Sequence, residues 1–138
     1  MAEAVGVAAG ILALVTTAYS STQALYKTIQ DFRHAPQDIQ HIAKEVEDLR
    51  GVLDLLKQKV HHLKDTIGLE EALKGCTAAC SEFRQMIEES NKHRKGERHS
   101  TRDRVAWIYK GKKQSKDFRT ALASYKDTLN IALGAETL

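Results

Sequence analysis

The chain has 138 residues, of which 28% are charged, and it contains one proline, eight glycines and two cysteines. This length supports a single domain with one hydrophobic core. Because no segment shows the alternation of β-branched residues that is typical of strands, the composition excludes a sheet-based fold and predicts an all-α domain.

The N-terminal segment is distinctive, because residues 4–26 contain no charged side chain and residues 4–15 are wholly apolar. As a helix, this segment would reach roughly 34 Å at about 1.5 Å per residue, enough to cross a hydrocarbon core of about 30 Å. The strictly apolar part, however, has only the length of a buried core helix or of a short segment that inserts into a membrane. The polar side chains of the second half make it a poor permanent span, and they are Thr16, Thr17, Ser20, Ser21, Thr22 and Gln23.

Two other interpretations of this segment remain open. A helix that is apolar on most sides is often the central helix of a bundle. A secretory signal peptide would need a basic start, whereas Glu3 is the only charged side chain before the apolar run. Gly6 and Gly10 form an edge of small residues that would let helices approach closely, either in a membrane oligomer or in a soluble bundle.

Two amphipathic helices are predicted next along the chain. Apolar residues recur at alternating steps of three and four from residue 39 to residue 63, which predicts a helix over residues 36–65. Pro36 suits its first turn, and Gly68 marks its far end. A third helix is expected over residues 69–91, followed by a polar connection, and its apolar face consists of Leu69, Leu73, Cys76, Cys80, Phe83 and Ile87.

The last helix is expected over residues 101–133. Ser100 and Asp103 resemble a capping box at its start, and Gly134 suits the position after its end. Gly111 lies in the widest gap of the apolar stripe, so we expect it to weaken or kink the first part of the helix. The apolar positions of this stripe are Val105, Ile108, Phe118, Leu122, Tyr125, Leu129 and Leu133.

Four helices joined by short links predict an up-down bundle, in which residues 1–33 form a largely apolar first helix packed against three amphipathic helices. The whole chain, residues 1–138, is then one helical domain. A dimer of long coiled coils is the alternative, although sustained heptads occur only over residues 39–63.

The sequence contains no pattern expected of an enzyme: no Gly-rich phosphate loop, no G-x-S-x-G and no carboxylate pair facing a pocket. Cys76 and Cys80 share one helical face within the core stripe, so we interpret them as buried thiols and not as metal ligands. His61 and His62 are adjacent on a helix and point about 100° apart, which does not make a bidentate site. We therefore expect no catalytic residue, no metal and no cofactor.

The positive charge of the chain is concentrated in one segment. Residues 92–113 contain nine Lys and Arg against two acids, a net charge of +7, which leaves −4 for the rest of the chain. Basic residues beside Trp107 and Tyr109 suit an anionic membrane interface, whereas a solvated helix face is the simpler interpretation. Because no motif that reads nucleic acid is present, we expect no nucleic-acid partner.

Four short segments follow one another in a specific order: residues 1–11 (MAEAVGVAAGI), 35–39 (APQDI), 104–107 (RVAW) before several lysines, and 124–133 (SYKDTLNIAL). Together they resemble the HeLo-like domain of fungi over nearly the whole chain. This domain stands at the N-terminus of fungal NLR-type (STAND) receptors and of amyloid-controlled cell-death effectors. The resemblance implies a bundle related to the HeLo domain of a fungal incompatibility toxin and to the executioner bundle of mixed lineage kinase domain-like protein in animal necroptosis.

The resemblance also implies a pore-forming function in fungal programmed cell death, as in heterokaryon incompatibility. Members of this group carry an N-terminal hydrophobic helix into the plasma membrane once a C-terminal region oligomerises them, so the domain is expected to be cytoplasmic at rest and at the plasma membrane when activated. The expected partners are an anionic phospholipid membrane, further copies of the domain, and an upstream NLR-type or amyloid partner. Neither an amyloid motif nor a nucleotide-binding domain follows Leu138, so that partner is expected to act through a C-terminal region missing here.

The residues expected to act in this mechanism fall into three groups. Gly6 and Gly10 are expected to pack helices, and Glu3 to form an acidic ring at the pore mouth. The side chains expected to insert into the membrane are Val5, Val7, Ile11, Leu12, Leu14 and Val15. At rest, all of these except Val7 are expected to be covered by the other three helices or partly shielded at one end. The residues expected to bind lipid headgroups are Lys92, Arg94, Lys95, Arg98, Arg102, Arg104, Trp107, Lys110, Lys112 and Lys113.

A soluble adaptor is the alternative function. It would act by contacts between bundles and would never enter lipid, with the 39–63 stripe and the basic segment as interaction surfaces. Changes in the first helix would then act only through stability, and lipid composition would have no effect.

Overall fold

The computed structural model describes residues 2–32, 37–63, 66–95 and 101–134, with side chains described for residues 8–32, 37–63, 66–89 and 111–134. In these ranges the chain forms an all-α bundle without strands, which confirms the predicted fold class. The elements are α1 (Ala2–Gln30), α2 (Gln37–Gln58), the short 3₁₀ helix η1 (Val60–His62), α3 (Leu69–Lys95) and α4 (Thr101–Leu133).

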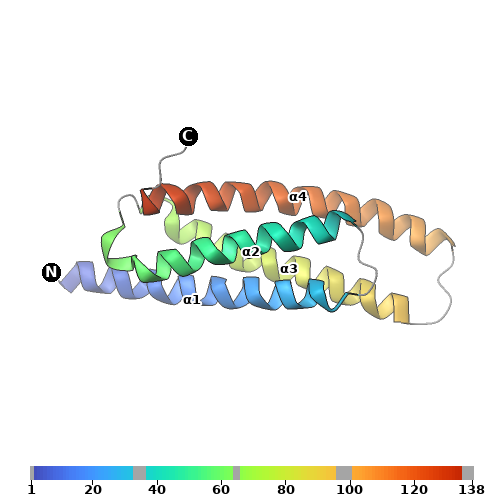
Figure 1. The fold of residues 1–138 in the computed structure, drawn as a ribbon, viewed down its shortest axis with the longest axis horizontal. Helices are drawn as coiled ribbons and strands as arrows, with labels where there is room; N and C mark the ends of the chain where they lie inside the picture. The colour runs from blue at the N-terminus through green and yellow to red at the C-terminus, as the bar shows by residue number, and fades with distance from the viewer. Residues whose placement is uncertain (1, 33–36, 64–65, 96–100, 135–138) are drawn as a thin grey trace.

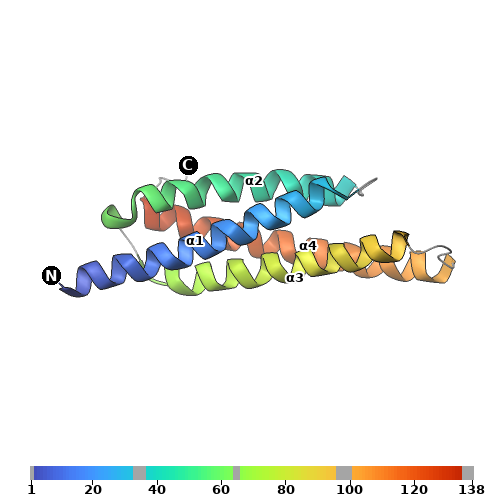
Figure 2. The same cartoon turned by 90° about the horizontal axis from the view of Figure 1, so that it is seen from below.

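The four helices alternate in direction along one long axis (Figure 1). Helix α1 packs against α2 and α3, and α4 packs against the same two helices. The helices α1 and α4 therefore occupy opposite corners of the bundle, with α2 and α3 on either side (Figure 2). In this arrangement α1 is a corner helix with a solvent-facing side, and the interpretation of α1 as a fully enclosed central helix is wrong.

The hydrophobic core follows the predicted stripes. Every stripe residue of α2 is at most 2% exposed, and the core continues into η1 through Val60. Each of these large side chains contributes about 1.5–3 kcal/mol when it is fully withdrawn from water. The buried residues of α2 are Ile39, Ile42, Val46, Leu49, Leu53 and Leu56.

Helices α3 and α4 are held together by two aromatic contacts. The rings of Phe83 and Phe118 stack with centroids 4.4 Å apart and nearly parallel planes. The ring of Tyr125 lies directly over Gly75, where a Cβ atom would come within 2.8 Å of the phenolic oxygen. Both contacts require a close approach of the two helices, and Gly75 permits it.

The helix ends differ from the predicted bounds in two places. Helix α2 ends at Gln58 and not near residue 65, because Lys59 leaves the helical conformation and its N–H is shared between the carbonyls of Leu55 and Leu56. Helix α3 continues to Lys95, four residues past the predicted end. The predicted stop at Gly134 is confirmed, since α4 ends at Leu133 and Gly134 has a positive φ of 75°. Gly68 also has a positive φ, 74°, but it lies directly before α3 and does not mark the end of α2.

Helix α4 does not break at its glycine. It runs without interruption from Thr101 to Leu133, and Gly111 is buried within it. The expected weakening of the first part of the helix is therefore not seen as a change in secondary structure. A residue without a side chain suits a helix surface against which other atoms pack closely.

Candidate membrane-interaction site

Helix α1 buries one narrow face. Its buried residues recur at alternating steps of three and four, the same spacing as in α2, and each is at most 7% exposed. Small and polar side chains interrupt the apolar ones along this face, which hides the pattern in the sequence. The residues of the face are Ala8, Ile11, Val15, Ala18, Thr22, Leu25 and Ile29.

The solvent-facing side of α1 is uncharged over most of the described helix. Its exposed residues are small, and the first exposed charge after them is Lys27. A surface helix of a globular protein normally carries charged residues on this side. The exposed residues that precede Lys27 are Ala9, Gly10, Ala13, Thr16, Thr17, Ser20 and Gln23.

The threonine hydroxyls of α1 bond to the helix itself. Thr16 Oγ1 donates to the carbonyl of Leu12 at 2.8 Å, and Thr17 Oγ1 donates to the carbonyl of Ala13 at 3.0 Å. The buried hydroxyl of Thr22 donates in the same way, at 2.7 Å, to the carbonyl of Tyr19. Because these donors are satisfied within the helix, the exposed Thr16 and Thr17 leave no unpaired hydroxyl donor on the outer surface of α1.

The predicted inserting residues divide between two environments. Ile11 and Val15 are buried, and Leu12 and Leu14 are half-buried against the core. Helix α1 as a whole packs mainly against α2 and α3, with a smaller contact to η1. Val5, Val7, Gly6 and Glu3 lie outside the described side chains.

Gly10 does not pack against another helix. It is exposed, and a Cβ atom added to it would meet nothing within 4 Å. The expectation that Gly10 brings helices together is therefore wrong for the bundle itself. The glycine that performs this task is Gly75, whose role depends on Tyr125, a residue 50 positions later in the chain.

The first turns of α1 extend beyond the neighbouring ends of the other helices (Figures 1 and 2). Farther along, α1 is fastened to α2 by the guanidinium of Arg50, which lies 5.3 Å from the ring centroid of Tyr26. Within residues 2–32, 37–63, 66–95 and 101–134, no helix combines the length and the apolar character needed to cross a membrane.

The basic segment lies at the other end of the molecule. The end of α3 and the start of α4 project together beyond α1 and α2, on the side away from the N-terminus (Figures 1 and 2). Lys112 and Lys113 of α4 are exposed. The structure thus separates the two predicted membrane elements along the long axis. The remaining predicted headgroup-binding residues lie outside the described side chains, and they are Lys92, Arg94, Lys95, Arg98, Arg102, Arg104, Trp107 and Lys110.

The two thiols are buried, as predicted. Cys76 and Cys80 are both free and 0% exposed. Hydrogen bonding with Cys76 and then burial raise the pKa of the Cys80 thiol. Burial, followed by the proximity of the two cysteines, also raises the pKa of Tyr125. Among the described residues, no group of three His, Cys, Asp or Glu side chains could hold a metal ion.

A comparison with protein families matches residues 2–138 to the model described as pigment biosynthesis cluster protein PigL N-terminal. The chain belongs to this family. It is therefore a helical domain of a fungal N-terminal family, and its four-helix structure is compatible with the resemblance to HeLo-like domains. No curated protein and no solved structure matches the chain.

Proposed function

We propose that this member of the PigL N-terminal family is a membrane-permeabilising executioner domain of a fungal cell-death pathway, in which α1 leaves the bundle and inserts into an anionic membrane. The observation that carries the proposal is the outer surface of α1. It is uncharged until Lys27, and its threonine hydroxyls are bonded to the backbone of the same helix. In lipid, every backbone polar group must be hydrogen-bonded within the protein. A helical segment that carries no charge on any side, as residues 8–26 do, can therefore move from a protein environment into lipid.

The energetics favour a switch over a permanent membrane anchor. Transfer of Ile11, Leu12, Leu14 and Val15 from water to lipid is worth about 6–12 kcal/mol in total. The bundle already buries most of this surface, since Ile11 and Val15 are covered and the two leucines are half-buried. The net difference between the two states is consequently small, and a modest bias shifts the population.

Oligomerisation supplies that bias. A single domain binds weakly, whereas linked copies bind through many contacts at a high effective concentration. In an assembled pore Glu3 would stand at the mouth. The upstream activator in this proposal is an NLR-type or amyloid partner linked through a C-terminal region.

Dye release from liposomes tests the proposal. The protein is oligomerised through a fused tag and added to vesicles with and without phosphatidylserine. Ala13→Lys places a charge at an exposed position of α1, so the folded bundle should lose less than about 0.5 kcal/mol of stability. We expect Ala13→Lys to abolish release, because a lysine near the bilayer centre costs about 2.5–3.5 kcal/mol for each inserted helix.

The matched control is Ser124→Lys, which adds the same charge at an exposed position of α4. It should release dye as the unmodified domain does. A version without Met1–Ala18 should also be inactive, with its helicity checked by circular dichroism. If the oligomerised domain releases no dye, or if Ala13→Lys releases it normally, the proposal is wrong and a soluble adaptor becomes the better interpretation.

A further inference from the structure

Helices α2 and α4 run side by side in the same direction, and one ion pair fixes their register (Figure 1). Arg119 Nη2 donates to Glu45 Oε1 at 2.8 Å, and Arg119 Nε donates to the same oxygen at 3.1 Å. Residues one or two turns before Glu45 therefore lie level with residues one or two turns before Arg119. This places His41 and Lys44 of α2 beside the stretch of α4 that begins at Lys112.

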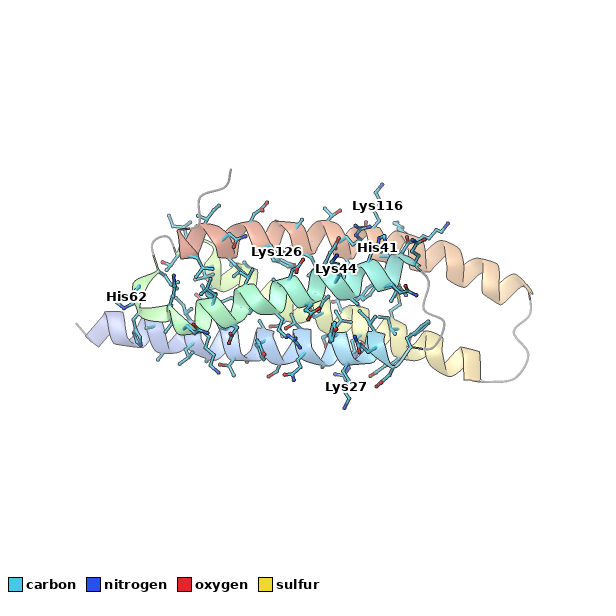
Figure 3. The ribbon with its side chains drawn as sticks, in the orientation of Figure 1. Lys27, His41, Lys44, His62, Lys116 and Lys126 are labelled. Atoms are coloured by element: carbon cyan, nitrogen blue, oxygen red, sulfur yellow. The ribbon has the colours of Figure 1, made fainter. Side chains whose placement is uncertain are left out.

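Three lysines and one histidine lie on this side of the bundle. Lys44, Lys112, Lys116 and His41 are all exposed. Figure 3 shows His41 and Lys44 on α2 beside the adjoining stretch of α4, and Lys116 projecting from the outer edge of α4, whereas Lys27 of α1 points away from the opposite side of the bundle. We define the α2–α4 face as His41, Lys44, Lys112 and Lys116.

The lysines of the α2–α4 face are not paired with acids in the described structure. None of the three forms an ion pair with another described residue. Of the nearby acids, Glu45 is held by Arg119, and Asp38 also interacts with Arg119. Of two further acids, Asp48 is exposed one turn beyond Lys44 on the same side of α2, whereas Asp117 follows Lys116 but points about 100° away around α4.

We infer that the α2–α4 face is where the domain first docks on an anionic membrane, with its lysines against the phosphate groups of lipid headgroups. This inference rests on the proposed function and deepens it. Each basic group held close to an anionic membrane surface contributes on the order of a fivefold increase in binding. The face is elongated and continues along α4 towards the basic segment, so it offers a long surface to a planar array of headgroups.

The diagonal arrangement of the helices gives this docking mode a specific consequence. The α2–α4 face and the side formed by α1 and α3 are on opposite sides of the bundle (Figure 2). A domain docked through α2 and α4 lies with its long axis along the membrane and with α1 on the side away from it. Docking and insertion are then separate steps, and α1 must leave its corner before it can reach the lipid.

Vesicle co-sedimentation at low salt tests the docking face independently of dye release. The protein is mixed with phosphatidylcholine vesicles that contain or lack phosphatidylserine. Lys44→Glu combined with Lys116→Glu should weaken binding to the anionic vesicles at least 20-fold, because loss of the two positive charges alone removes about fivefold for each lysine. The matched control is Lys27→Glu combined with Lys74→Glu, which makes the same change in net charge at exposed positions of α1 and α3.

The α2–α4 face is supported if the first pair of substitutions weakens binding and the control pair changes it less than threefold. Equal losses for both pairs would show that only net charge matters and would overturn the inference. Tighter binding to duplex DNA than to anionic vesicles at the same salt concentration would overturn it as well. If the unmodified protein binds through this face but releases no dye, the docking face is supported and the proposed function is wrong. If the unmodified protein releases dye and the Lys44→Glu, Lys116→Glu variant binds normally, the proposed function is supported and the docking face is wrong.

Discussion

The phenol of Tyr125 occupies the space that a side chain at position 75 would need. A Cβ atom on Gly75 would lie 2.8 Å from the phenolic oxygen and 3.0 Å from two ring carbons of Tyr125. No other described contact between α3 and α4 depends on the absence of a side chain in this way. The pair sets how closely the two helices approach beside the buried cysteines.

Gly75→Ala should destabilise the domain by about 1 kcal/mol. Overpacking costs about 1–3 kcal/mol, and the better helix propensity of alanine returns about 1 kcal/mol. The control is Gly51→Ala on α2, where an added Cβ meets nothing within 4 Å, and this variant should gain about 0.4–1 kcal/mol. Urea unfolding followed by circular dichroism measures both, and equal stabilisation of the two variants would mean that Tyr125 moves away without cost.

The sequence predicted the parts of the fold that depend on local pattern. The stripe from Ile39 to Leu56 is wholly buried, and the stop at Gly134 occurs where glycine takes a positive φ. The position of Gly75 under Tyr125 was not predictable, because it results from the register between two helices and not from spacing within one of them.

The candidate site was predicted less completely than the fold. The sequence located the uncharged segment, but α1 looked apolar on all sides because Ala18 and Thr22 conceal its narrow buried face. Composition also carries no information about which helices are diagonal partners. For this reason the positions of Lys44 and Lys116 on adjoining helices became evident only from the three-dimensional arrangement.

The stability of the domain should fall at alkaline pH. Burial raises the pKa of Tyr125 above its ordinary value of 10.0, with smaller contributions from Cys76, Cys80 and Glu82. The unfolded chain then loses the Tyr125 proton at a lower pH than the folded chain, so stability is fully present below pH 10 and is lost as the pH rises through the folded-state pKa. The pKa of the Cys80 thiol is also raised, from an ordinary value of 9.0, so this thiol likewise lowers stability as the pH rises.

Urea unfolding at about pH 8 and about pH 10.5 measures this loss. Tyr125→Phe removes the titrating phenol and keeps the ring, so its stability should fall less between the two pH values than that of the unmodified protein. An unchanged pH dependence in Tyr125→Phe would assign the effect to the Cys80 thiol.

The two cysteines should report the release of α1. Both are 0% exposed on α3, and α3 packs against α1 and α4. In the closed bundle alkylation is slow, because the thiols are covered and the raised pKa of Cys80 keeps it protonated. Anionic vesicles should accelerate labelling if α1 leaves the bundle, and the acceleration should be absent in Ala13→Lys.

Labelling followed by mass spectrometry gives the rate for each cysteine. The labelling rate of the protein unfolded in concentrated guanidinium chloride serves as the reference for fully exposed cysteines. Full dye release with no change in the labelling rate would show that α3 stays covered and that α1 does not depart from it.

The contact of Arg50 with Tyr26 should act as a restraint on α1. The guanidinium lies 5.3 Å from the ring centroid, and the Arg50 side chain is 28% exposed. A cation–π contact at such a site is worth about 0.5–1 kcal/mol, so Arg50→Gln should lower the free energy required to separate α1 from α2 by that amount. The fraction of domains with α1 released would rise about two- to fivefold, since 1.4 kcal/mol corresponds to a factor of ten.

Arg50→Gln should therefore accelerate dye release from anionic vesicles at limiting protein concentration, although it removes a positive charge that would otherwise aid binding. Loss of the contact with Tyr26 and loss of the positive charge should therefore change the rate of dye release in opposite directions. Lys57→Gln removes the same charge from an exposed position of α2 and should slow release or leave it unchanged. If both variants slow release equally, Arg50 contributes through its charge alone and the contact with Tyr26 does not hold α1 in place.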